Sequence, residues 1–388
     1  MIKDISSVFT EKFSGDPLIV KSPGRINIIG EHTDYNEGFV LPGAIDKGIY
    51  VAIDKNQTEQ INLFAVHFNE SYSVSLNDIT PQKSWPTYIL GVVFQLQQKG
   101  YPVKGFNMVI DGDVPVGAGL SSSAAVECAV VFALNQLFNF GLSKMEMVLI
   151  AQKAEHTFSG VLCGIMDMFA SMFGKKNQVI KLDCRSLEYS YKPIQLGDYS
   201  LVLFNTNVKH SLASSAYNER RQQCEQGVAW VKELHPLVNS LRDINLDMLK
   251  QCVLENDKLI YQRCKFVVEE IQRLQDACID LEKGNIRELG VKLFATHKGL
   301  SEDYEVSCSE LDFLIENVKD NPAVAGARMM GGGFGGCTIN IVLQKNLDEL
   351  IENLSRKYKQ EMHRELSPIL VNIENGTSVI KSQNRATV

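Results

Sequence analysis

The sequence predicts an α+β protein built from two domains. Its 388 residues exceed the usual size of one domain, and a hydrophobic content of 45% is enough to fill two cores. Short strand-like runs alternate with helical patterns in the first half, whereas long helices dominate the second half. The pattern restarts near Gly197, so we expect domains over residues 1–196 and 197–388, with mixed sheets and helices packed on them. No long linker separates the two halves, which should therefore pack directly on each other and share a cleft.

The first half is expected to contain both strands and amphipathic helices. Strand-like apolar runs occupy Leu18–Val20, Gly48–Ile53, Phe106–Ile110 and Val179–Asp183. Helical apolar spacing, preceded by serines that can cap a helix, covers Ser121–Phe138 and Ser143–Phe158.

The second half is expected to contain one long structural helix and several strands. Apolar residues repeat at intervals of three and four at Tyr261, Cys264, Val267, Val268, Ile271, Leu274, Cys278 and Leu281. Gly284 stands where a helix C-terminus favours glycine. Strands are predicted over Ser200–Phe204, Cys337–Leu343 and Pro368–Ile373.

Charge and cysteine content exclude several classes of function. The net charge of −7 and a pI near 5.6 argue against nucleic acid as a partner. No apolar run approaches the roughly 20 residues that span a bilayer, so no membrane role is expected. The nine cysteines form no C-x-x-C pair, and several lie in apolar stretches, as reduced buried thiols would. We therefore expect a cytoplasmic protein, and we favour a monomer.

The segment Val116–Ala125 (VGAGLSSSAA) has the composition of an anion-binding loop that runs into a helix. Small residues let backbone amides approach a phosphate closely, and serine hydroxyls and the amides of the helix start add donors. This pattern indicates a polyphosphate ligand. A serine-capped helix after an ordinary loop remains an equal alternative from these residues alone.

A second glycine-rich segment, Gly331–Gly336 (GGGFGG), formally matches a dinucleotide-binding signature in the wrong context. That signature needs a strand before it and a helix after it, but Met329 and Met330 precede this segment and the strand-like Cys337–Leu343 follows. We expect instead a backbone that passes close to a ligand or to the other domain, or else a glycine turn in a hairpin. The chain also contains no Walker-type phosphate motif.

A dense polar cluster lies within Pro23–Pro42 (PGRINIIGEHTDYNEGFVLP). Arg25, Glu31, His32 and Asp34 stand among glycines and apolar residues. Carboxylates accept hydrogen bonds from hydroxyls and an imidazole adds a donor or acceptor, so this loop is typical of a sugar or polyol site. A polar surface turn is the alternative.

Together, these three segments resemble the galactokinases, members of the GHMP small-molecule kinase superfamily, in order and spacing. The resemblance covers nearly the whole chain and includes AQKAEHTFSG (151–160), CGIMDMFASMFGKK (163–176), LDCRSLEY (182–189), SAYNERR (215–221) and GARMMGGGFGGCTINIV (326–342). It implies a two-domain GHMP-kinase-like fold with the active site in the cleft between the domains. The implied reaction is the ATP-dependent phosphorylation of the anomeric hydroxyl of α-D-galactose, which gives galactose 1-phosphate and ADP and opens galactose breakdown.

The resemblance also implies where ATP and Mg²⁺ bind. The residues expected to wrap the ATP phosphates are Gly117, Ala118, Gly119, Leu120, Ser121, Ser122 and Ser123. The Ser123 hydroxyl and Glu155 are expected to hold Mg²⁺, which suits a hard cation that prefers oxygen ligands. Without the family resemblance, the more plausible interpretation of Glu155 is an ordinary charged helix residue. Trp85 and Tyr88 are candidates for the adenine pocket, although aromatic residues at this spacing also suit a core.

The resemblance assigns the chemistry to Asp167 and Arg25. Asp167 is expected to accept the proton of the attacking sugar hydroxyl or to orient that hydroxyl, and Arg25 to steady the developing charge. From the residues alone Asp183 is as plausible a base; only the CGIMD context separates the two. The implied sugar-binding residues are Glu31, His32, Thr33, Asp34, Gly164 and Tyr217.

The sequence departs from the family motifs at two places, and two other functions are alternatives to this assignment. Met168 follows the catalytic aspartate where many galactokinases carry glutamine, and MMGGGFGG stands where a threonine and an alanine are commoner. Another superfamily kinase, for N-acetylgalactosamine, mevalonate or homoserine, would keep the predicted phosphate-binding segment Val116–Ala125, here called the phosphate loop. It would change the predicted sugar-binding segment, residues 28–42, here called the sugar loop. A non-catalytic galactose and ATP sensor would have a shortened serine-alanine stretch, whereas Ser121–Ala125 is complete here.

Overall fold

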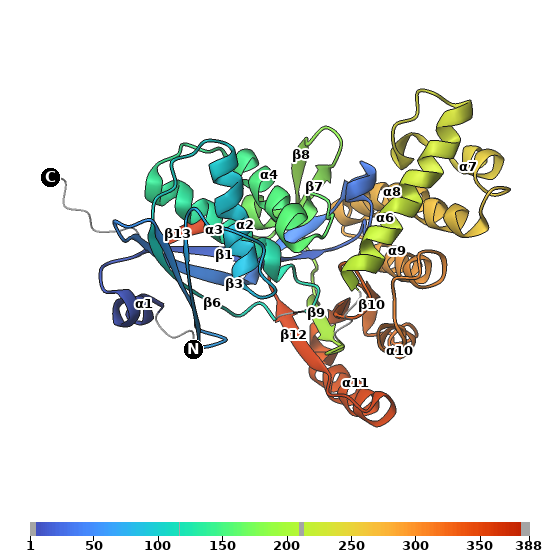
Figure 1. Ribbon diagram of the computed structural model, residues 1–388. Coiled ribbons are helices and arrows are strands. Elements are labelled where there is room, and N and C mark those ends of the chain that lie inside the picture. Colours follow the sequence, from blue (N-terminus) through green and yellow to red (C-terminus); the bar gives the residue numbers. More distant parts are fainter. Residues whose placement is uncertain (1–4, 116, 209–212, 382–388) are drawn as a thin grey trace.

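The computed structural model describes residues 5–115, 117–208 and 213–381, which form three sheets. The first half is organised around a six-stranded sheet, in which β4 and β6 run parallel and the other neighbours are antiparallel (Figure 1). Its strands, in spatial order, are β13 (Ser378–Lys381), β1 (Leu18–Asn27), β3 (Pro42–Lys55), β6 (Phe106–Gly112), β4 (Gln60–Ala65) and β5 (Glu70–Ser75).

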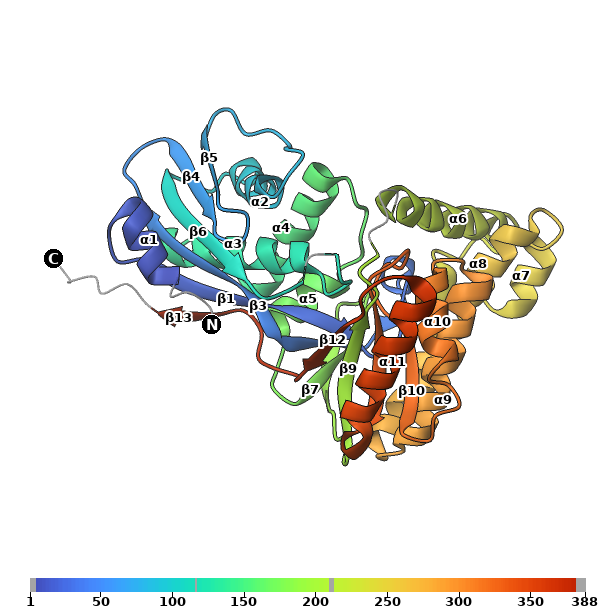
Figure 2. The ribbon, with the colours of Figure 1, turned by 90° about the horizontal axis from the view of Figure 1, so that it is seen from below.

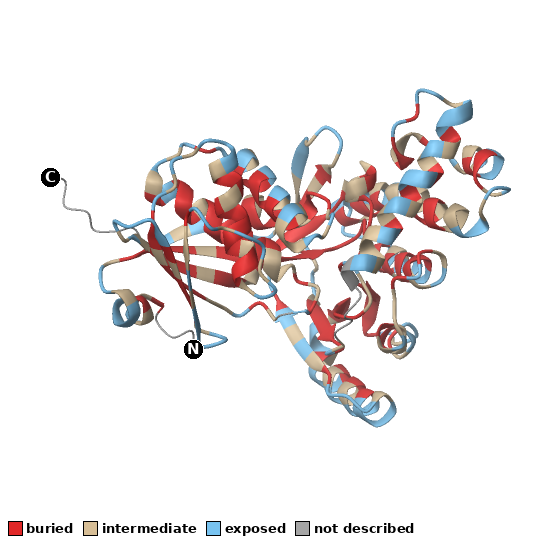
Figure 3. Ribbon diagram, in the orientation of Figure 1, coloured by how far each residue is buried: buried red, intermediate tan, exposed pale blue. Residues whose placement is uncertain are grey.

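Helices cover both faces of this sheet because apolar side chains alternate along its strands. Val20 belongs to the large core with the main helical layer, whereas its neighbour Ile19 packs on the opposite face with Phe9 of α1 (Ile5–Phe13). The main layer consists of α2 (Pro86–Gln98), α3 (Ser122–Phe138), α4 (Lys144–Ala154) and α5 (Met166–Phe173). Helix α3 is buried over most of its length, as the red ribbon of Figure 3 shows.

The second half contains a four-stranded antiparallel sheet with helices beside it (Figure 2). Its strands, in spatial order, are β10 (Val324–Met329), β11 (Cys337–Leu343), β9 (Tyr199–Asn205) and β12 (Ser367–Val371). The helices are α6 (Ala213–Leu234), α7 (Leu246–Cys252), α8 (Lys258–Glu282), α9 (Ile286–Lys298), α10 (Ser309–Glu316) and α11 (Leu347–Met362). In both ribbon views α1 and β13 lie at one end of the molecule and α7 at the other.

Short elements complete the fold. A three-stranded sheet is formed by β2 (Phe39–Val40), β7 (Gln178–Asp183) and β8 (Tyr189–Pro193). Single helical turns are η1 (Asp34–Asn36), η2 (Glu155–Ser159), η3 (Leu241–Asp243), η4 (Gly299–Asp303) and η5 (Gln344–Asn346). No helix of the described residues is sufficiently long and apolar to cross a bilayer. All nine cysteines are free thiols.

The structure contains each predicted strand and helix, with some changed limits. The helix predicted over Ser143–Phe158 begins with a capping box at Ser143, but its α-helical part ends at Ala154 and the chain continues as the π turn η2. The strand predicted over Pro368–Ile373 ends at Val371. The division into two domains at residue 196 remains a prediction. Strand β13, near the end of the chain, pairs with β1 in the first half.

The context inferred for the Gly331–Gly336 segment was wrong in one respect. A strand does precede it, because β10 runs to Met329 and pairs antiparallel with β11. The segment is therefore the connection of a β-hairpin, and the following strand excludes a dinucleotide-binding turn. It also passes close to the phosphate loop, since a Cβ built on Gly331 would lie 3.1 Å from the Gly119 carbonyl oxygen. Both of the expected interpretations therefore hold.

Helix α9 lies against β10 at a contact between two glycines. A Cβ built on Gly290 would lie 1.8 Å from the Ala325 carbonyl oxygen, and one on Gly326 would lie 2.2 Å from the Cα of Gly290. Glycine at position 290 thus allows the helix to approach the strand that leads into the glycine-rich hairpin.

We expect Gly290→Ala to lower the free energy of unfolding by about 2 kcal/mol or more, because the added methyl group forces α9 away from β10. Alanine would otherwise favour the helix by about 1 kcal/mol, so the sign tests the contact. Urea unfolding measures the change. Gly284→Ala, at a left-handed position with open space around it, is the control, with an expected loss of about 1 kcal/mol. A Gly290→Ala variant as stable as the wild type would contradict this packing.

Candidate functional site

One cavity of about 360 Å³ brings most of the predicted site residues together. It lies where the start of α3, the loop after β1, η2, the start of α5, α6 and the β10–β11 hairpin meet. The predicted residues that line it are Arg25, Glu31, His32, Asp34, Gly117, Gly119, Leu120, Ser121, Ser122, Ser123, Glu155, Asp167 and Tyr217.

The phosphate loop enters α3 without a side-chain cap. Val116 lies outside the described residues, whereas Gly117 and Gly119 adopt φ angles of 78° and 75°, which glycine tolerates. Ser121 is the N-cap residue, but its side chain makes no capping hydrogen bond. The first amides of a helix have no intrahelical partner, so this helix start suits an anion. Ala118 does not line the cavity.

The Arg25 guanidinium and the Asp167 carboxylate form a bidentate ion pair at the edge of the cavity. Arg25 Nε donates to Asp167 Oδ1 at 2.7 Å and Nη2 to Oδ2 at 2.9 Å. The Ser121 hydroxyl donates to Asp167 Oδ2 at 2.5 Å, and Arg25 Nη1 donates to the Gly119 carbonyl at 2.6 Å. Burial opposes the charge of Arg25, but Asp167 and other carboxylates outweigh it and raise the pKa of Arg25. The pair thereby joins β1, α5 and the phosphate loop.

Asp183, the alternative base, lies elsewhere. Its carboxylate is held by both terminal nitrogens of Arg242, and it does not line the cavity. Burial opposes its charge, but the hydrogen bonds from Arg242 and from the Ser186 and Arg185 amides together outweigh burial and lower the pKa of Asp183. The sequence alone left Asp167 and Asp183 equally plausible as the base, but only Asp167 lines the cavity.

His32 and Asp34 place two titratable groups of the sugar loop inside the cavity. Burial lowers the pKa of the His32 imidazole to about 4. Its Nδ1 lies 2.7 Å from the Tyr35 hydroxyl, whereas Nε2 is buried without a protein partner. Burial, and then the nearby Asp167, raises the pKa of Asp34 to about 7. Neutral sugar hydroxyls suit such a pair, because His32 is neutral and Asp34 is at most partly charged near pH 7.

Thr33 and Gly164 lie beside the cavity but do not line it. The Thr33 hydroxyl lies 2.6 Å from the Phe39 carbonyl oxygen and 3.0 Å from that of Gly30, so it fastens the loop and does not line the cavity. The direct contact of Thr33 with sugar stays a prediction, and its hydroxyl is engaged within the loop. Gly164 gives Asp34 its space, since a Cβ at Gly164 would lie 1.9 Å from Asp34 Oδ2.

The candidate magnesium ligands include a neighbour that the sequence did not reveal. Glu155 lies in η2 beside Ser123, and its Oε2 atom is buried without a partner. Glu127, one turn beyond Ser123 on α3, is buried and neither of its carboxylate oxygens has a hydrogen-bond donor. Burial, and then the proximity of Glu155, raises the pKa of Glu127 well above its usual value. Orphaned hard oxygens beside a hydroxyl fit a Mg²⁺ ion.

The two aromatic candidates for the adenine pocket differ in their position relative to the cavity. Tyr88 lines the cavity, and burial raises the pKa of its phenol to about 12. Trp85 does not line it, and its indole N–H donates to Glu70 Oε2 at 2.9 Å. Met168 also lines the cavity as a buried apolar neighbour of Asp167.

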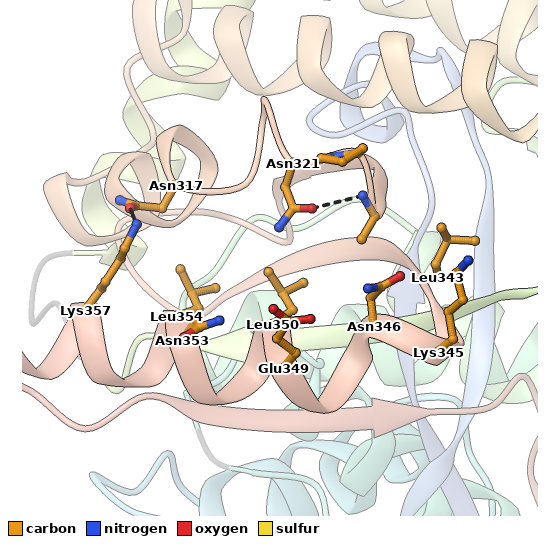
Figure 4. A pocket seen from close by; sticks show the side chains of 12 residues that line it. Asn317, Asn321, Leu343, Lys345, Asn346, Glu349, Leu350, Asn353, Leu354 and Lys357 are labelled. Carbon is orange, nitrogen blue, oxygen red and sulfur yellow. Dashed lines mark hydrogen bonds between the residues drawn. The ribbon is translucent and has the colours of Figure 1, made fainter.

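Another cavity, of about 550 Å³, lies between α11 and the segment that follows α10 (Figure 4). Asparagine and lysine side chains line much of it, among them Asn317, Asn321 and Lys357. It contains none of the predicted site residues and no arginine–carboxylate pair. Its larger volume does not outweigh the chemistry gathered in the smaller cavity.

Comparison with known proteins identifies the family. The galactokinase galactose-binding signature matches residues 7–55, and the GHMP kinases N terminal domain and C terminal models match residues 87–175 and 277–360. A galactokinase from Clostridium perfringens is 39% identical over 384 residues, covering 97% of this chain and 98% of the relative. One from Thermotoga maritima is 38% identical over 362 residues, covering 93% and 99%.

The solved structures agree with the sequence relatives. Lactococcus lactis galactokinase complexed with galactose superposes with a TM-score of 0.92 at 33% identity, covering 96% of this chain and 98% of that one. A mevalonate kinase structure, with a TM-score of 0.63 at 19% identity and covering 92% and 99%, shares the fold. The two-domain fold and the sequence relatives, which extend over nearly the full length, lead to one conclusion: this chain belongs to the galactokinase family of GHMP kinases.

Proposed function

We propose that this chain transfers the γ-phosphoryl group of MgATP to the anomeric hydroxyl of α-D-galactose, giving galactose 1-phosphate and ADP. The observation that carries the proposal is the Arg25–Asp167 pair, which lies between the phosphate loop and the sugar loop in one cavity. Phosphoryl transfer depends mainly on positioning and charge stabilisation, and this pair contributes to both.

Asp167 accepts the proton of the sugar hydroxyl, or orients that hydroxyl, as it attacks phosphorus. Arg25 retains its charge and holds both carboxylate oxygens in place. Because Ser121 also donates to Asp167, the carboxylate is tied to the residue at which α3 begins. Proton acceptor and phosphate cradle therefore keep a fixed relative position.

The start of α3 receives the nucleotide phosphates. Its amides and the hydroxyls of Ser122 and Ser123 are the donors, and Glu155 with Ser123 holds the cation. When bound, Mg²⁺ neutralises phosphate charge and fixes the orientation of the γ-phosphoryl group.

The sugar loop receives the hexose. His32 offers Nε2, the buried nitrogen that has no hydrogen-bond partner among the described residues, to a sugar hydroxyl. Glu31 and Asp34 accept hydrogen bonds, and the Tyr217 ring forms part of the wall. Because its pKa is about 4, His32 is neutral near pH 7 and adds no second charge beside Asp167.

The proposed reaction is tested by ADP release with MgATP and galactose, N-acetylgalactosamine, glucose, arabinose or mevalonate. We expect galactose to give the highest kcat/KM, because the loop 31–34 is built from hydroxyl-binding groups. Preference for N-acetylgalactosamine or mevalonate would replace the proposed substrate. Binding of galactose and ATP without ADP release would indicate a sensor.

Asp167→Asn should lower kcat by roughly 10²-fold or more, because an amide cannot accept the proton. Galactose affinity should change far less, and single-turnover kinetics with a binding titration separate the two effects. The matched control is Asp183→Asn, which also removes a carboxylate held by an arginine but lies outside the cavity. Equal loss of activity in both variants, or near-normal turnover of Asp167→Asn, would remove Asp167 from this role.

Asp34→Asn tests the electrostatics of the sugar loop. The pKa of Asp34 is about 7 in the folded protein against a reference of 3.8, so the folded protein binds the proton more tightly than the unfolded chain. The wild type should therefore lose stability relative to Asp34→Asn as the pH rises from about 4 to about 7. Thermal unfolding of both proteins across this range measures the difference.

Asp247→Asn, at an aspartate whose side chain is 94% exposed, is the control for that series. A stability difference between the wild type and Asp34→Asn that stays constant from pH 4 to 8 would contradict the raised pKa of Asp34.

A further inference from the structure

Arg328 is a fully buried arginine that connects the two halves of the chain. It lies on β10, and its side chain is 0% exposed. Nε donates to the Ile28 carbonyl at 2.9 Å, and Nη2 donates to the Asn27 carbonyl. Both carbonyls belong to the segment in which β1 ends and the sugar loop begins. A residue near the end of the sequence thus fixes the start of a loop near its beginning.

The same guanidinium also holds Glu31. Arg328 Nη1 donates to Glu31 Oε1 at 2.9 Å, and the Gly331 amide donates to the same oxygen at 2.9 Å. Glu31 lines the cavity, whereas Arg328 does not. Arg328 therefore acts on the cavity through Glu31 and does not line it itself.

The arrangement needs an arginine and not just a positive charge. Nη1 also donates to the Met329 carbonyl at 2.6 Å, so one planar group serves a carboxylate and three carbonyls. The side chain of Glu31 is 2% exposed, so its carboxylate depends on the Arg328 and Gly331 donors for hydrogen bonds. A lysine keeps the charge but cannot place donors on all four acceptors at once.

We propose that Arg328 is a positioning residue for sugar recognition, which orients the Glu31 carboxylate toward the hexose and fixes the start of the sugar loop. The inference rests on the proposed function, since it assumes that the hexose contacts Glu31. It deepens that function by assigning part of the sugar specificity to β10. Because Gly331 shares the Glu31 oxygen and lies against Gly119, the glycine-rich hairpin bridges the sugar and phosphate loops.

The test is a double-mutant cycle on galactose affinity with Arg328→Lys and Glu31→Gln, measured by NMR titration without nucleotide. Arg328→Lys alone should weaken galactose binding about 10-fold, as expected when a charged hydrogen-bonding partner is misplaced. In the Glu31→Gln background the same change should cost less than about 2-fold, because the carboxylate it orients is gone. In steady-state assays the KM for galactose should rise and the KM for MgATP stay within about 2-fold.

Arg263→Lys is the matched control. Arg263 is equally buried, and it donates to the Asp303 carbonyl and to Glu305, neither of which lines the cavity. It should lower thermal stability as Arg328→Lys does and leave galactose affinity nearly unchanged. This comparison separates positioning from a general loss of stability.

The outcomes distinguish the inference from the function on which it rests. An equal loss of galactose affinity from Arg328→Lys in both backgrounds would show a purely structural role and overturn the inference alone. The same holds if Arg263→Lys weakens galactose binding as much as Arg328→Lys does. If Arg328→Lys does not fold, Glu31→Gln alone decides: galactose affinity unchanged from the wild type overturns the inference, and a loss of about 10-fold supports it. Wild-type protein that binds no galactose would overturn the proposed function as well.

Discussion

The ion pair between the buried Arg25 and the half-buried Asp167 is the interaction on which the geometry of the site depends. Removing such charges from water is costly unless the pair is well aligned and further hydrogen bonds satisfy it. Here the alignment is bidentate, and Ser121 and the Gly119 carbonyl complete it. Meeting these requirements fixes β1, the phosphate loop and the first turn of α5 relative to one another. The electrostatic demand of one pair thereby sets the distance between the Asp167 carboxylate, the proposed proton acceptor, and the start of α3, the proposed phosphate site.

Acidic groups outnumber their cationic partners in the rest of the cavity and directly beside it. Glu127 is buried and Asp34 half-buried, both with raised pKa values, and Glu155 keeps an oxygen without a hydrogen-bond partner among the described residues. Carboxylate oxygens that lack hydrogen-bond donors lower the stability of the folded protein. Such a loss of stability is typical of functional sites. A cation beside Ser123 and a hexose beside His32 would supply the missing partners. This accounts for the presence of polar atoms that a purely structural core would leave out.

The sequence predicted those features that depend on local pattern. Strands such as β6 and helices such as α3 follow from apolar periodicity, and a family motif pointed to Asp167, which lines the cavity. Contacts between distant segments carry no such signal: Arg328 and Glu31 are 297 positions apart, and nothing in a strand-like GARM marks its arginine as buried. Glu127 was missed because a single acid in an apolar helix resembles a surface residue. The sequence also gives no sign that the Thr33 hydroxyl turns back to the loop, because its neighbours His32 and Asp34 both line the cavity.

The most direct measurement is a crystal structure of the protein with galactose, Mg²⁺ and a non-hydrolysable ATP analogue. We expect the anomeric oxygen within about 3 Å of the Asp167 carboxylate, in line with a terminal phosphate held at residues 117–123. A hexose bound away from Asp167, or a terminal phosphate away from the start of α3, would contradict the claim that this ion pair aligns the two substrates.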